Sequence, residues 1–430
     1  MQYLDYIDLK YKPDKTDLVC EYYVEPQKGI LIKKAAGAIA SESSIGTWTD
    51  VTTSTKNCDN LAAKVFDIDF KSNIVKIAYP LDLFEPANMP QILSSIAGNI
   101  FGMKILDRLK LLDIHFPDPL LRSFKGPVHG ILGVRKKLKI IDRPLIGTIV
   151  KPKVGLNPKE QAKVAFDAWL GGCDIVKDDE NLSNMRFNRF KDRVNEVLKA
   201  KEKAEKLTGE RKMYMPNTTA ECSEMLKRAK YVKEQGGICA MIDILSLGWS
   251  AVQSIRNYNE HLQLVLHAHR AGHAALTRDK KHGISMLTIS KVSRLIGVDQ
   301  LHIGTMIGKM EGKSEVPIID HEIEDSMFIP KPGFTIIKGG HALEQDWHGI
   351  KPIFAVCSGG LNPTHIPYLI HHLGRNIILQ FGGGIHGHAQ GTMMGAEAAR
   401  QALEATLSNH SLKDYAKKHE ELAQALKQWG

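Results

Sequence analysis

The chain has 430 residues, of which 43% are hydrophobic and 24% are charged. A chain of this length and composition can bury a large apolar core, which excludes disordered and fibrous proteins. Its 57 basic and 48 acidic residues give a net charge of +9, which favours anionic partners such as nucleic acids, acidic membranes or phosphorylated small molecules.

Three further features narrow these classes. The compact basic run 135–139 has no interleaved aromatic residues, so we do not expect a nucleic-acid partner. The N-terminus has no apolar signal core, and no uncharged apolar run approaches the roughly 18 residues of a membrane span, so we expect neither export nor a membrane partner. The scattered cysteines form no C-x-x-C pair and indicate the reduced thiols of a cytoplasmic protein.

Residues 1–130 are predicted to form a smaller N-terminal α+β domain. The expected strands are 18–24, 63–69 and 74–79. The expected helices are 26–41 and 90–102. The segment 124–131, with two glycines and a proline, is the expected junction to the next domain.

Residues 131–430 alternate short apolar runs with amphipathic stretches, which predicts parallel strands joined by helices. The expected strands are 145–152, 173–179, 212–217, 239–245, 262–269, 301–307, 352–360 and 376–384. Eight such units predict an α/β fold of the (β/α)8 TIM barrel class, ending in further helices. One helix should begin at Asn157, which is followed by a proline and by Glu160. The proline-containing stretch 312–342 looks like an insertion after the sixth strand.

Charged residues stand at the ends of the first two predicted strands, where a parallel barrel places its active site. The first strand ends in Lys151 and Lys153, which alternation should turn to one side. The second ends in Lys177, Asp178, Asp179 and Glu180, whose carboxylates suit Mg²⁺. Solvated surface lysines and a helix-capping or salt-bridge role for the acids are the alternative interpretations.

The fifth and sixth strands add histidines and a further basic loop. His267, His269 and Arg270 end the fifth strand, and His302 ends the sixth. Zinc is disfavoured because no third nitrogen or sulfur ligand stands nearby, so phosphate or oxyanion binding fits better. Lys309, with glycines on either side, lies on a loop suited to closing over a substrate.

The last two strands end in glycines, in Ser358-Gly359-Gly360 and Gly382-Gly383-Gly384. Glycines let backbone N–H groups approach an anion, and the loops after strands seven and eight are a frequent phosphate site in this fold. Two tight turns are the alternative. With Arg270, His302 and Lys309 as counter-charges, the pattern predicts a substrate with a phosphate at each end.

Taken together, these segments resemble the ribulose-1,5-bisphosphate carboxylase/oxygenase (rubisco) family, in its archaeal form III. The resemblance rests on GTIVKPKVGL, GGCDIVKDDE, HAHRAGHA, HIGTMIGKMEG, CSGG and QFGGG, with ESSIGTWTDV and GNIFG in the first domain. It implies Mg²⁺-dependent carboxylation, with competing oxygenation, of ribulose 1,5-bisphosphate to two 3-phosphoglycerate molecules. It also implies a place in AMP or nucleoside salvage.

The resemblance assigns the catalytic residues. Lys177 would react with CO₂ to form a carbamate that binds Mg²⁺ with Asp179 and Glu180. That carbamate would take the substrate's C3 proton, His269 would assist, and Lys151, supported by Lys153, would protonate the product. Lys309 would hold the incoming CO₂. We expect the acidic neighbours to raise the pKa of Lys177, and Asp178 to add a charge near the carbamate.

The resemblance also assigns substrate-binding residues and assembly. One phosphate would bind Thr47, Trp48, Gly360, Gly382 and Gly383. The other would bind Arg270, His302 and Ser358, and Gly359 would be a further substrate-binding residue. Glu42, pairing with Lys309, and Asn99, beside the metal, would join Thr47 and Trp48 in reaching the site from a neighbouring subunit. A homodimer, or an oligomer of dimers without a small subunit, is therefore implied.

Two other functions stay open. A rubisco-like enolase or isomerase of phosphorylated sugars would use the same metal residues, but such proteins usually alter the lid lysine or the second phosphate site. A basic RNA-binding protein on an inactive barrel is a distant alternative, because the metal residues are present. Residues 385–389, Ile-His-Gly-His-Ala, depart from the Thr-Leu-Gly-His-Pro common in the family, which leaves the shape of this loop in doubt.

Overall fold

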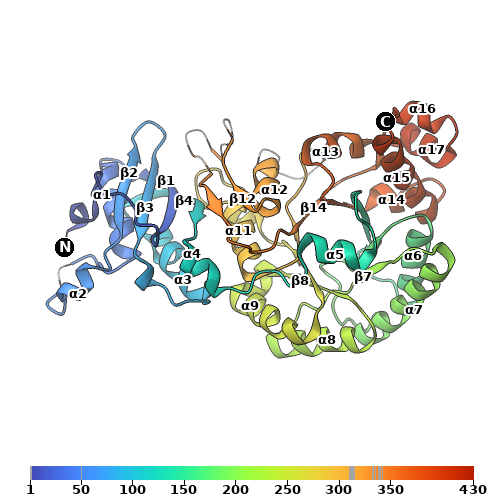
Figure 1. The fold of residues 1–430 in the computed structure, drawn as a ribbon, viewed down its shortest axis with the longest axis horizontal. Helices are drawn as coiled ribbons and strands as arrows, with labels where there is room; N and C mark the ends of the chain where they lie inside the picture. Colours follow the sequence, from blue (N-terminus) through green and yellow to red (C-terminus); the bar gives the residue numbers. More distant parts are fainter. Residues whose placement is uncertain are drawn as a thin grey trace. The chain divides into compact units, whose positions relative to one another are not determined.

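The computed structural model describes residues 2–49, 51–308, 315–331, 334, 336, 337, 340 and 342–430. By their contacts they form two compact units, each described separately below (Figure 1). The first unit spans residues 1–126, 272–296 and 325–350, and the second spans 127–271, 297–324 and 351–430. A search of the described helices finds none that is both long and apolar enough to cross a bilayer.

The first unit is built on a five-stranded sheet in the order β10-β4-β1-β3-β2. Its strands are β1 (Leu18–Pro26), β2 (Lys64–Asp69), β3 (Ile74–Tyr79), β4 (Leu106–His115) and β10 (Gly283–Ile284). All neighbours are antiparallel except β10 and β4. The central strands β1 and β3 are largely buried, so the sheet carries the core of this unit.

Short helices surround this sheet, and the α+β prediction for the N-terminal part is confirmed. They are η1 (Tyr3–Tyr6), α1 (Ile32–Glu42), α2 (Lys56–Asp59), η2 (Leu81–Leu83), α3 (Met89–Ala97), η3 (Asn99–Gly102), α4 (Asp118–Ser123), α10 (Ala274–Thr277) and α11 (Met286–Ile296). A small ribbon pairs β12 (Met327–Phe328) with β13 (Gln345–Asp346). The predicted helix 90–102 is interrupted at Gly98, whose backbone lies so close to the carbonyl of Ser94 that a Cβ would stand 2.1 Å from it.

The second unit is a parallel barrel, and the predicted (β/α)8 class is confirmed. Its strands are β5 (Leu145–Ile149), β6 (Ile175–Lys177), β7 (Met213–Met215), β8 (Cys239–Asp243), β9 (Val265–His269), β11 (Gln300–His302), β14 (Phe354–Ser358) and β15 (Ile377–Phe381). The order is β7-β6-β5-β15-β14-β11-β9-β8. A single parallel bridge between Asn217 and Met241 nearly closes the barrel. Each strand overlaps a predicted run.

The helices of this unit surround the barrel, with α6 to α9 along its outside in Figure 1 and α5 at one end of it. They are α5 (Gly130–Leu138), α6 (Pro158–Leu170), α7 (Phe190–Thr208), α8 (Cys222–Glu234), α9 (Ile244–Leu262), α12 (Val316–Glu324), η4 (Pro363–His365), α13 (Ile366–Leu373), α14 (Gly383–His386), α15 (Thr392–Leu407), α16 (Leu412–Ala416) and α17 (Glu420–Trp429). Helix α6 begins as predicted, because the Asn157 side chain accepts from the Glu160 N–H and Glu160 accepts from the Asn157 N–H.

The predicted insertion over 312–342 is corrected in part. Residues Val316–Glu324 form α12, the barrel helix that follows β11, and the apolar Val316, Ile319 and Ile323 on it are buried. The prolines of this stretch favoured a loop prediction, although these three apolar residues have helical spacing. The chain from residue 325 to 350 belongs to the first unit.

Helix α5 closes the amino end of the barrel, opposite to the strand ends that carry the charged residues. Its Ile131, Val134 and Leu138 pack into the same apolar cluster as strand residues of the barrel interior. The buried Asp299 anchors this helix, because its Oδ1 accepts from the N–H groups of His129 (2.7 Å) and Gly130 (2.8 Å). Its Oδ2 accepts from the N–H of Leu266, a residue of β9, at 2.9 Å.

Asp299→Asn is expected to lower the free energy of unfolding by about 1–3 kcal/mol. An amide keeps one accepting oxygen, but its NH₂ would face the N–H of Leu266, which leaves two buried donors against each other. Urea unfolding of this variant should be compared with Asp167→Asn, which alters the exposed pair with Lys163 and should change stability by less than about 1 kcal/mol. Equal midpoints for the two variants would contradict the anchoring role.

Candidate active site

Five strands of the second unit end in polar residues at the same mouth of the barrel. These last residues are Lys177 of β6, Asp243 of β8, His269 of β9, His302 of β11 and Ser358 of β14. Parallel strands bring their carboxyl ends together, so these side chains are held by the barrel's own hydrogen bonding rather than by a flexible loop.

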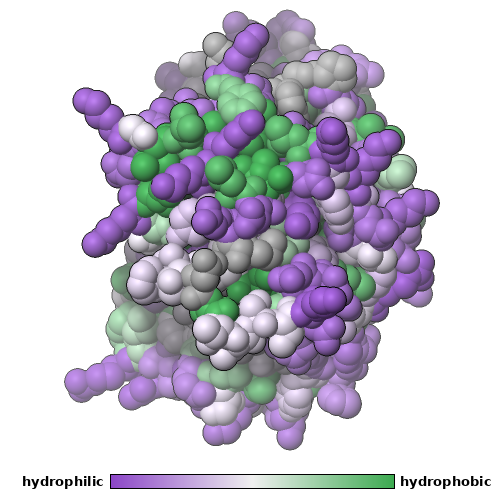
Figure 2. All heavy atoms as spheres, turned by 90° about the vertical axis from the view of Figure 1, so that its left-hand side faces the viewer, coloured by the Kyte–Doolittle hydropathy of each residue, from purple (hydrophilic) through white to green (hydrophobic). Residues whose placement is uncertain are grey.

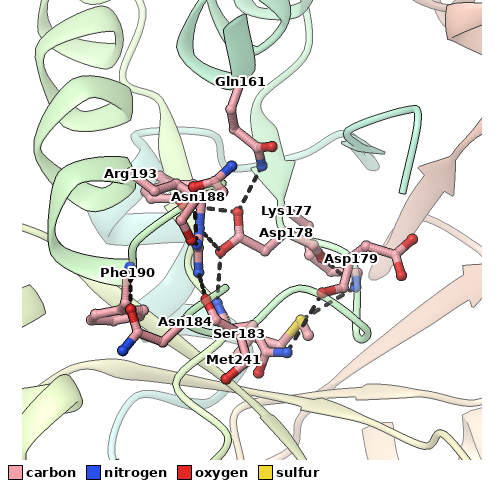
Figure 3. Close-up of polar contacts among 12 residues, drawn as sticks. Gln161, Lys177, Asp178, Asp179, Ser183, Asn184, Asn188, Phe190, Arg193 and Met241 are labelled. Carbon is pink, nitrogen blue, oxygen red and sulfur yellow. Dashed lines mark hydrogen bonds and ion pairs between the residues drawn. The ribbon is translucent and has the colours of Figure 1, made fainter. Parts of the chain in front are cut away.

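Lys177 is completely buried at this mouth. Its Nζ donates to the carbonyl of Asp178 at 2.8 Å and to Met241 Sδ at 3.2 Å (Figure 3). It also lies 3.8 Å from Glu180 Oε2. Burial lowers its pKa below the usual value, although Glu180 and other nearby carboxylates raise it. The acidic neighbours therefore act in the predicted direction, but the net pKa is lowered, because the free-energy cost of removing an ammonium from water exceeds the stabilisation by these carboxylates. The amine is easier to deprotonate than an exposed lysine.

Asp179 is fixed by two partners beside this lysine. Lys151 Nζ donates to its Oδ2 at 2.7 Å, and Asn181 donates to its Oδ1 from the backbone (3.1 Å) and the side chain (2.9 Å). Burial would raise the pKa of Asp179, but the hydrogen bonds from Lys151 and Asn181 outweigh it and lower that pKa. The carboxylate is thus held ionised and oriented, and two predicted site residues are brought into direct contact.

His269 is held between two carboxylates. Its Nδ1 lies 3.1 Å from Asp243 Oδ1, and its Nε2 lies 3.6 Å from Glu180 Oε2. Burial, followed by the charge of Lys177, lowers the pKa of His269 despite these carboxylates. The sequence reasoning missed Asp243, although it ends a predicted strand and the rule that selected Lys177 would have found it.

His302 takes part in a buried hydrogen-bonded chain. Its Nε2 lies 2.9 Å from His267 Nε2, its Nδ1 lies 2.8 Å from Ser358 Oγ, and His267 Nδ1 lies 2.8 Å from Gln300 Oε1. Burial lowers the pKa of both histidines far below the usual value, so both rings are neutral at pH 7. The prediction that His302 supplies a counter-charge is therefore corrected. Because Gln300 Oε1 accepts from His267 Nδ1–H, His267 Nε2 accepts from His302 Nε2–H, and His302 Nδ1 accepts from the Ser358 hydroxyl.

Asp178 points away from Lys177 and not toward it. Its carboxylate accepts from Gln161 Nε2 (3.0 Å), Arg193 Nε (2.9 Å), Tyr214 OH (2.8 Å) and the Asn217 N–H (3.0 Å), as Figure 3 shows for the first two. The expected extra charge beside Lys177 is therefore corrected, because Arg193 neutralises it on the other face of the strand end.

The Asp178–Arg193 pair belongs to a network that holds the segment after β6. Arg193 Nη2 donates to the carbonyl of Ser183 at 2.8 Å, and Arg193 Nη1 donates to the carbonyl of Asn188 at 3.2 Å. Asn188 in turn donates to the carbonyl of Leu156 at 2.8 Å, on the loop that follows Lys151. The network therefore joins the loops after the first two barrel strands (Figure 3).

The glycine loops lie close to charged side chains of the same mouth. A Cβ on Gly304 would stand 2.4 Å from Nη2 of the buried Arg270, so only glycine leaves room for that guanidinium. Burial lowers the pKa of Arg270 to about 10, which leaves it charged at pH 7. At Gly382 a Cβ would lie 3.5 Å from Lys151 Cε. The predicted lid residue Lys309 lies outside the described residues.

Lys153 is not placed with Lys151. Strand β5 ends at Ile149, so the alternation that should have turned both amines to one side stops before it reaches them. Lys153 is exposed, whereas Lys151 is partly buried against Asp179.

In the first unit, two of the four predicted residues meet. Asn99 Nδ2 donates to Glu42 Oε1 at 3.4 Å. Trp48 is 84% exposed, and Thr47 beside it is partly exposed. Figure 2, which views the left-hand side of Figure 1, shows hydrophobic residues at the surface among hydrophilic ones. Trp48 therefore contributes little to the core of its own chain.

Comparison with known proteins decides the family. The catalytic-domain model of the ribulose bisphosphate carboxylase large chain matches residues 130–429, and the N-terminal-domain model matches residues 5–120. The chain belongs to the rubisco large-chain family. Similar relatives include the ribulose bisphosphate carboxylases of Methanosarcina mazei, 50% identical and covering 99% of both chains, and of Methanocaldococcus jannaschii, 48% identical and covering 99% of this chain and 100% of that one. The predicted archaeal rubisco relationship is confirmed.

Solved rubisco structures share the fold over the whole chain. The dimeric archaeal rubisco from Hyperthermus butylicus is 45% identical, with a TM-score of 0.94, covering 100% of this chain and 99% of that one. The octameric rubisco from Pyrococcus horikoshii is 43% identical, with a TM-score of 0.92, covering 100% of this chain and 97% of that one.

The residues at the barrel mouth fit the Mg²⁺ that the rubisco family implies. Asp179 and Glu180 supply hard oxygen donors, and the pKa of each is lowered despite burial, so both are ionised at pH 7. In the described part of the chain no three His, Cys, Asp or Glu side chains form a ready-made metal cluster. The third oxygen ligand would come from Lys177, 3.8 Å from Glu180, once a carbamate gives it carboxylate-like oxygens.

Proposed function

We propose that this chain carboxylates ribulose 1,5-bisphosphate to two molecules of 3-phosphoglycerate, with Mg²⁺ as cofactor, a carbamate on Lys177 and oxygenation as the competing reaction. The enzyme class is that of its family, ribulose-bisphosphate carboxylase. One observation supports the proposal most directly. Glu180 Oε2 lies 3.8 Å from Lys177 Nζ and 3.6 Å from His269 Nε2, at the mouth of the barrel.

In this proposal the barrel residues divide the proton transfers among them. Lys177, as its carbamate, takes the C3 proton, and His269, held by Asp243, moves a second proton. Lys151, which is hydrogen-bonded to Asp179, protonates the final carbanion. When bound, Mg²⁺ supplies Lewis-acid stabilisation of the negative charge that develops on the substrate. Lys309 holds the incoming CO₂.

The substrate's two phosphates bind at separate places in this proposal. Gly360, Gly382 and Gly383 contribute backbone N–H groups to one, with Thr47 and Trp48. Arg270, Ser358 and Gly359 bind the other, with His302 orienting the Ser358 hydroxyl rather than adding charge. Lys153 is the least supported of these residues, because it is exposed and lies beyond the end of β5.

We propose a homodimer as the smallest active unit, with Glu42, Thr47, Trp48 and Asn99 completing the site of the neighbouring subunit. The exposure of Trp48 supports this arrangement. Dimeric and octameric assemblies in the titles of the similar structures support dimers or oligomers of dimers. A small subunit is not expected.

The proposed setting is AMP or nucleoside salvage in the cytoplasm, supported by the archaeal relatives. The domain boundary at residue 130 stays a prediction. A rubisco-like enolase or isomerase is the second candidate, and it is disfavoured because Arg270 and Ser358 are both present at the barrel mouth.

Incubation of the purified protein with Mg²⁺, radiolabelled bicarbonate and ribulose 1,5-bisphosphate tests the proposal. We expect acid-stable label in 3-phosphoglycerate. Enolisation of the substrate without labelled product would transfer the assignment to the enolase or isomerase function.

Activation by CO₂ is expected to rise with pH, because only the neutral amine of Lys177 attacks CO₂. The neutral fraction grows as pH approaches the pKa, and burial lowers that pKa, so the rise should come at lower pH than for an exposed lysine. Preincubation with Mg²⁺ and bicarbonate from about pH 6 to about pH 9, followed by assays at one fixed pH, measures this. An activation that falls with rising pH would contradict the role of Lys177.

A further inference from the structure

The segment after the glycines of β15 is the part of the site that departs from the common family pattern. It reads Ile-His-Gly-His-Ala over residues 385–389, and the proposed mechanism uses none of these residues. Gly382 and Gly383 have no side chains of their own to fix them, and a Cβ on Gly383 would meet nothing within 4 Å. Their position must therefore come from the residues around them.

His386, the last residue of α14, joins three elements through its ring. Its Nε2 lies 2.9 Å from Thr148 Oγ1 on β5, and its Nδ1 lies 3.0 Å from Thr392 Oγ1, the first residue of α15. The buried Thr148 also donates to the carbonyl of Phe381 at 3.1 Å, immediately before Gly382.

A count of protons fixes the direction of these hydrogen bonds. The carbonyl of Phe381 can only accept, so it takes the single hydroxyl proton of Thr148. Thr148 Oγ1 then accepts from His386 Nε2–H, the ring also donates to the carbonyl of Ile149 on β5, and Nδ1 accepts from the Thr392 hydroxyl. Burial lowers the pKa of His386 to about 4, which keeps the ring neutral at pH 7. Both ring nitrogens are therefore used.

These contacts tie the glycine loop to the strand that carries Lys151. Thr148 stands three positions before Lys151, whose Cε lies 3.5 Å from the place of a Cβ on Gly382. A shift of α14 away from β5 would move Gly382 relative to Lys151, and a misplaced phosphate-binding group weakens substrate binding.

We propose that His386 is a positioning residue for the bisphosphate: through Thr148 it holds Gly382 and Gly383 at a fixed distance from Lys151, and so tightens substrate binding. The inference rests on the proposed function, which places one phosphate on these glycines. It concerns affinity for the bisphosphate and not the activation of Lys177, since His386 makes no contact with the metal-binding residues.

The test is a double-mutant cycle with His386→Leu and Thr148→Val, read as the Kd of ribulose 1,5-bisphosphate by calorimetry on protein without Mg²⁺ and bicarbonate, so that the substrate is not consumed. Each single variant should raise Kd on the order of tenfold, with kcat changed less than about threefold. The effects of the two single variants should not multiply in the double variant, because both remove the hydrogen bond between His386 and Thr148. His386→Gln, which keeps an N–H donor, should restore most of the affinity.

His388→Leu is the matched control in the same loop. His388 Nε2 contacts the carbonyl of Glu421 on α17 and not β5, so this variant should lower the melting temperature but change Kd less than about threefold. If it raises Kd as much as His386→Leu, general loosening of the loop explains the effect and the inference fails. Unchanged Kd in the single variants, or effects that multiply in the double variant, would also overturn it.

The outcomes separate this inference from the proposed function. An unaltered protein that binds the bisphosphate but forms no labelled product refutes carboxylation and leaves the Kd comparison decisive for His386. If His386→Leu does not fold, Thr148→Val compared with His386→Gln decides the same question. Failure of the unaltered protein to bind the bisphosphate overturns both.

Discussion

Lys177→Met is expected to reduce carboxylation by about a thousandfold or more while the chain still folds. Methionine has a similar volume and suits a completely buried position beside Met241, so packing is retained. It cannot form a carbamate, so the proposed base and one oxygen ligand are lost together. Steady-state assays with radiolabelled bicarbonate, and calorimetric titration with Mg²⁺, measure the two losses separately.

Lys212→Met is the matched control for this variant. Lys212 is also buried, but it precedes β7 at the opposite end of the barrel and donates to the carbonyl of Cys173 (2.9 Å) and to Glu210 (2.7 Å). We expect it to lower stability and leave carboxylation within about threefold, because it contacts no site residue. Full activity in Lys177→Met, or equal loss in both variants, would refute the role of Lys177.

Arg193→Met is expected to lower the free energy of unfolding by about 3–5 kcal/mol, because it leaves the buried carboxylate of Asp178 without its counter-charge. The same change removes the hydrogen bonds to Ser183 and Asn188 that hold the loop carrying Asp179 and Glu180. Weaker Mg²⁺ binding should therefore accompany the lower stability. Urea unfolding measures the free energy of unfolding. Calorimetric titration with Mg²⁺, at a temperature where the variant is folded, measures the affinity for the metal.

The exposed pair Lys163–Asp167 supplies the comparison for this prediction. Lys163→Met removes an ion pair of similar length, 2.8 Å, on the surface of α6. It should cost less than about 1 kcal/mol, because solvent screens exposed charges. A similarly small cost for Arg193→Met would contradict the role of Arg193 as the buried counter-charge of Asp178.

Much of the fold follows from local sequence pattern. Apolar runs such as 239–245 and 352–360 are separated by amphipathic stretches, and each run is long enough for one buried strand. Residues at the ends of these runs could be placed at one mouth, because parallel strands leave no other arrangement. This rule predicts the site residues Lys177, His269, His302 and Ser358.

Period-two alternation was less informative where strands are short. Strand β5 ends at Ile149, so Lys153 lies well beyond the regular strand. Strand β6 ends at Lys177, and the side chain of the next residue, Asp178, lies on the other face. The actual end of a strand depends on hydrogen bonding to its neighbours in the barrel, which no single run of residues reveals.

The amino-acid sequence by itself determined the barrel class, the N-terminal α+β part, the family and the chemical types of residue at the strand ends. Only the tertiary structure decided their charge states and partners: Lys177 has a lowered pKa, His302 is neutral, Asp178 pairs with Arg193, and His386 bridges Thr148 and Thr392. The physical reason is that desolvation and hydrogen-bond direction depend on everything packed around a group, whereas a sequence shows only its neighbours along the chain.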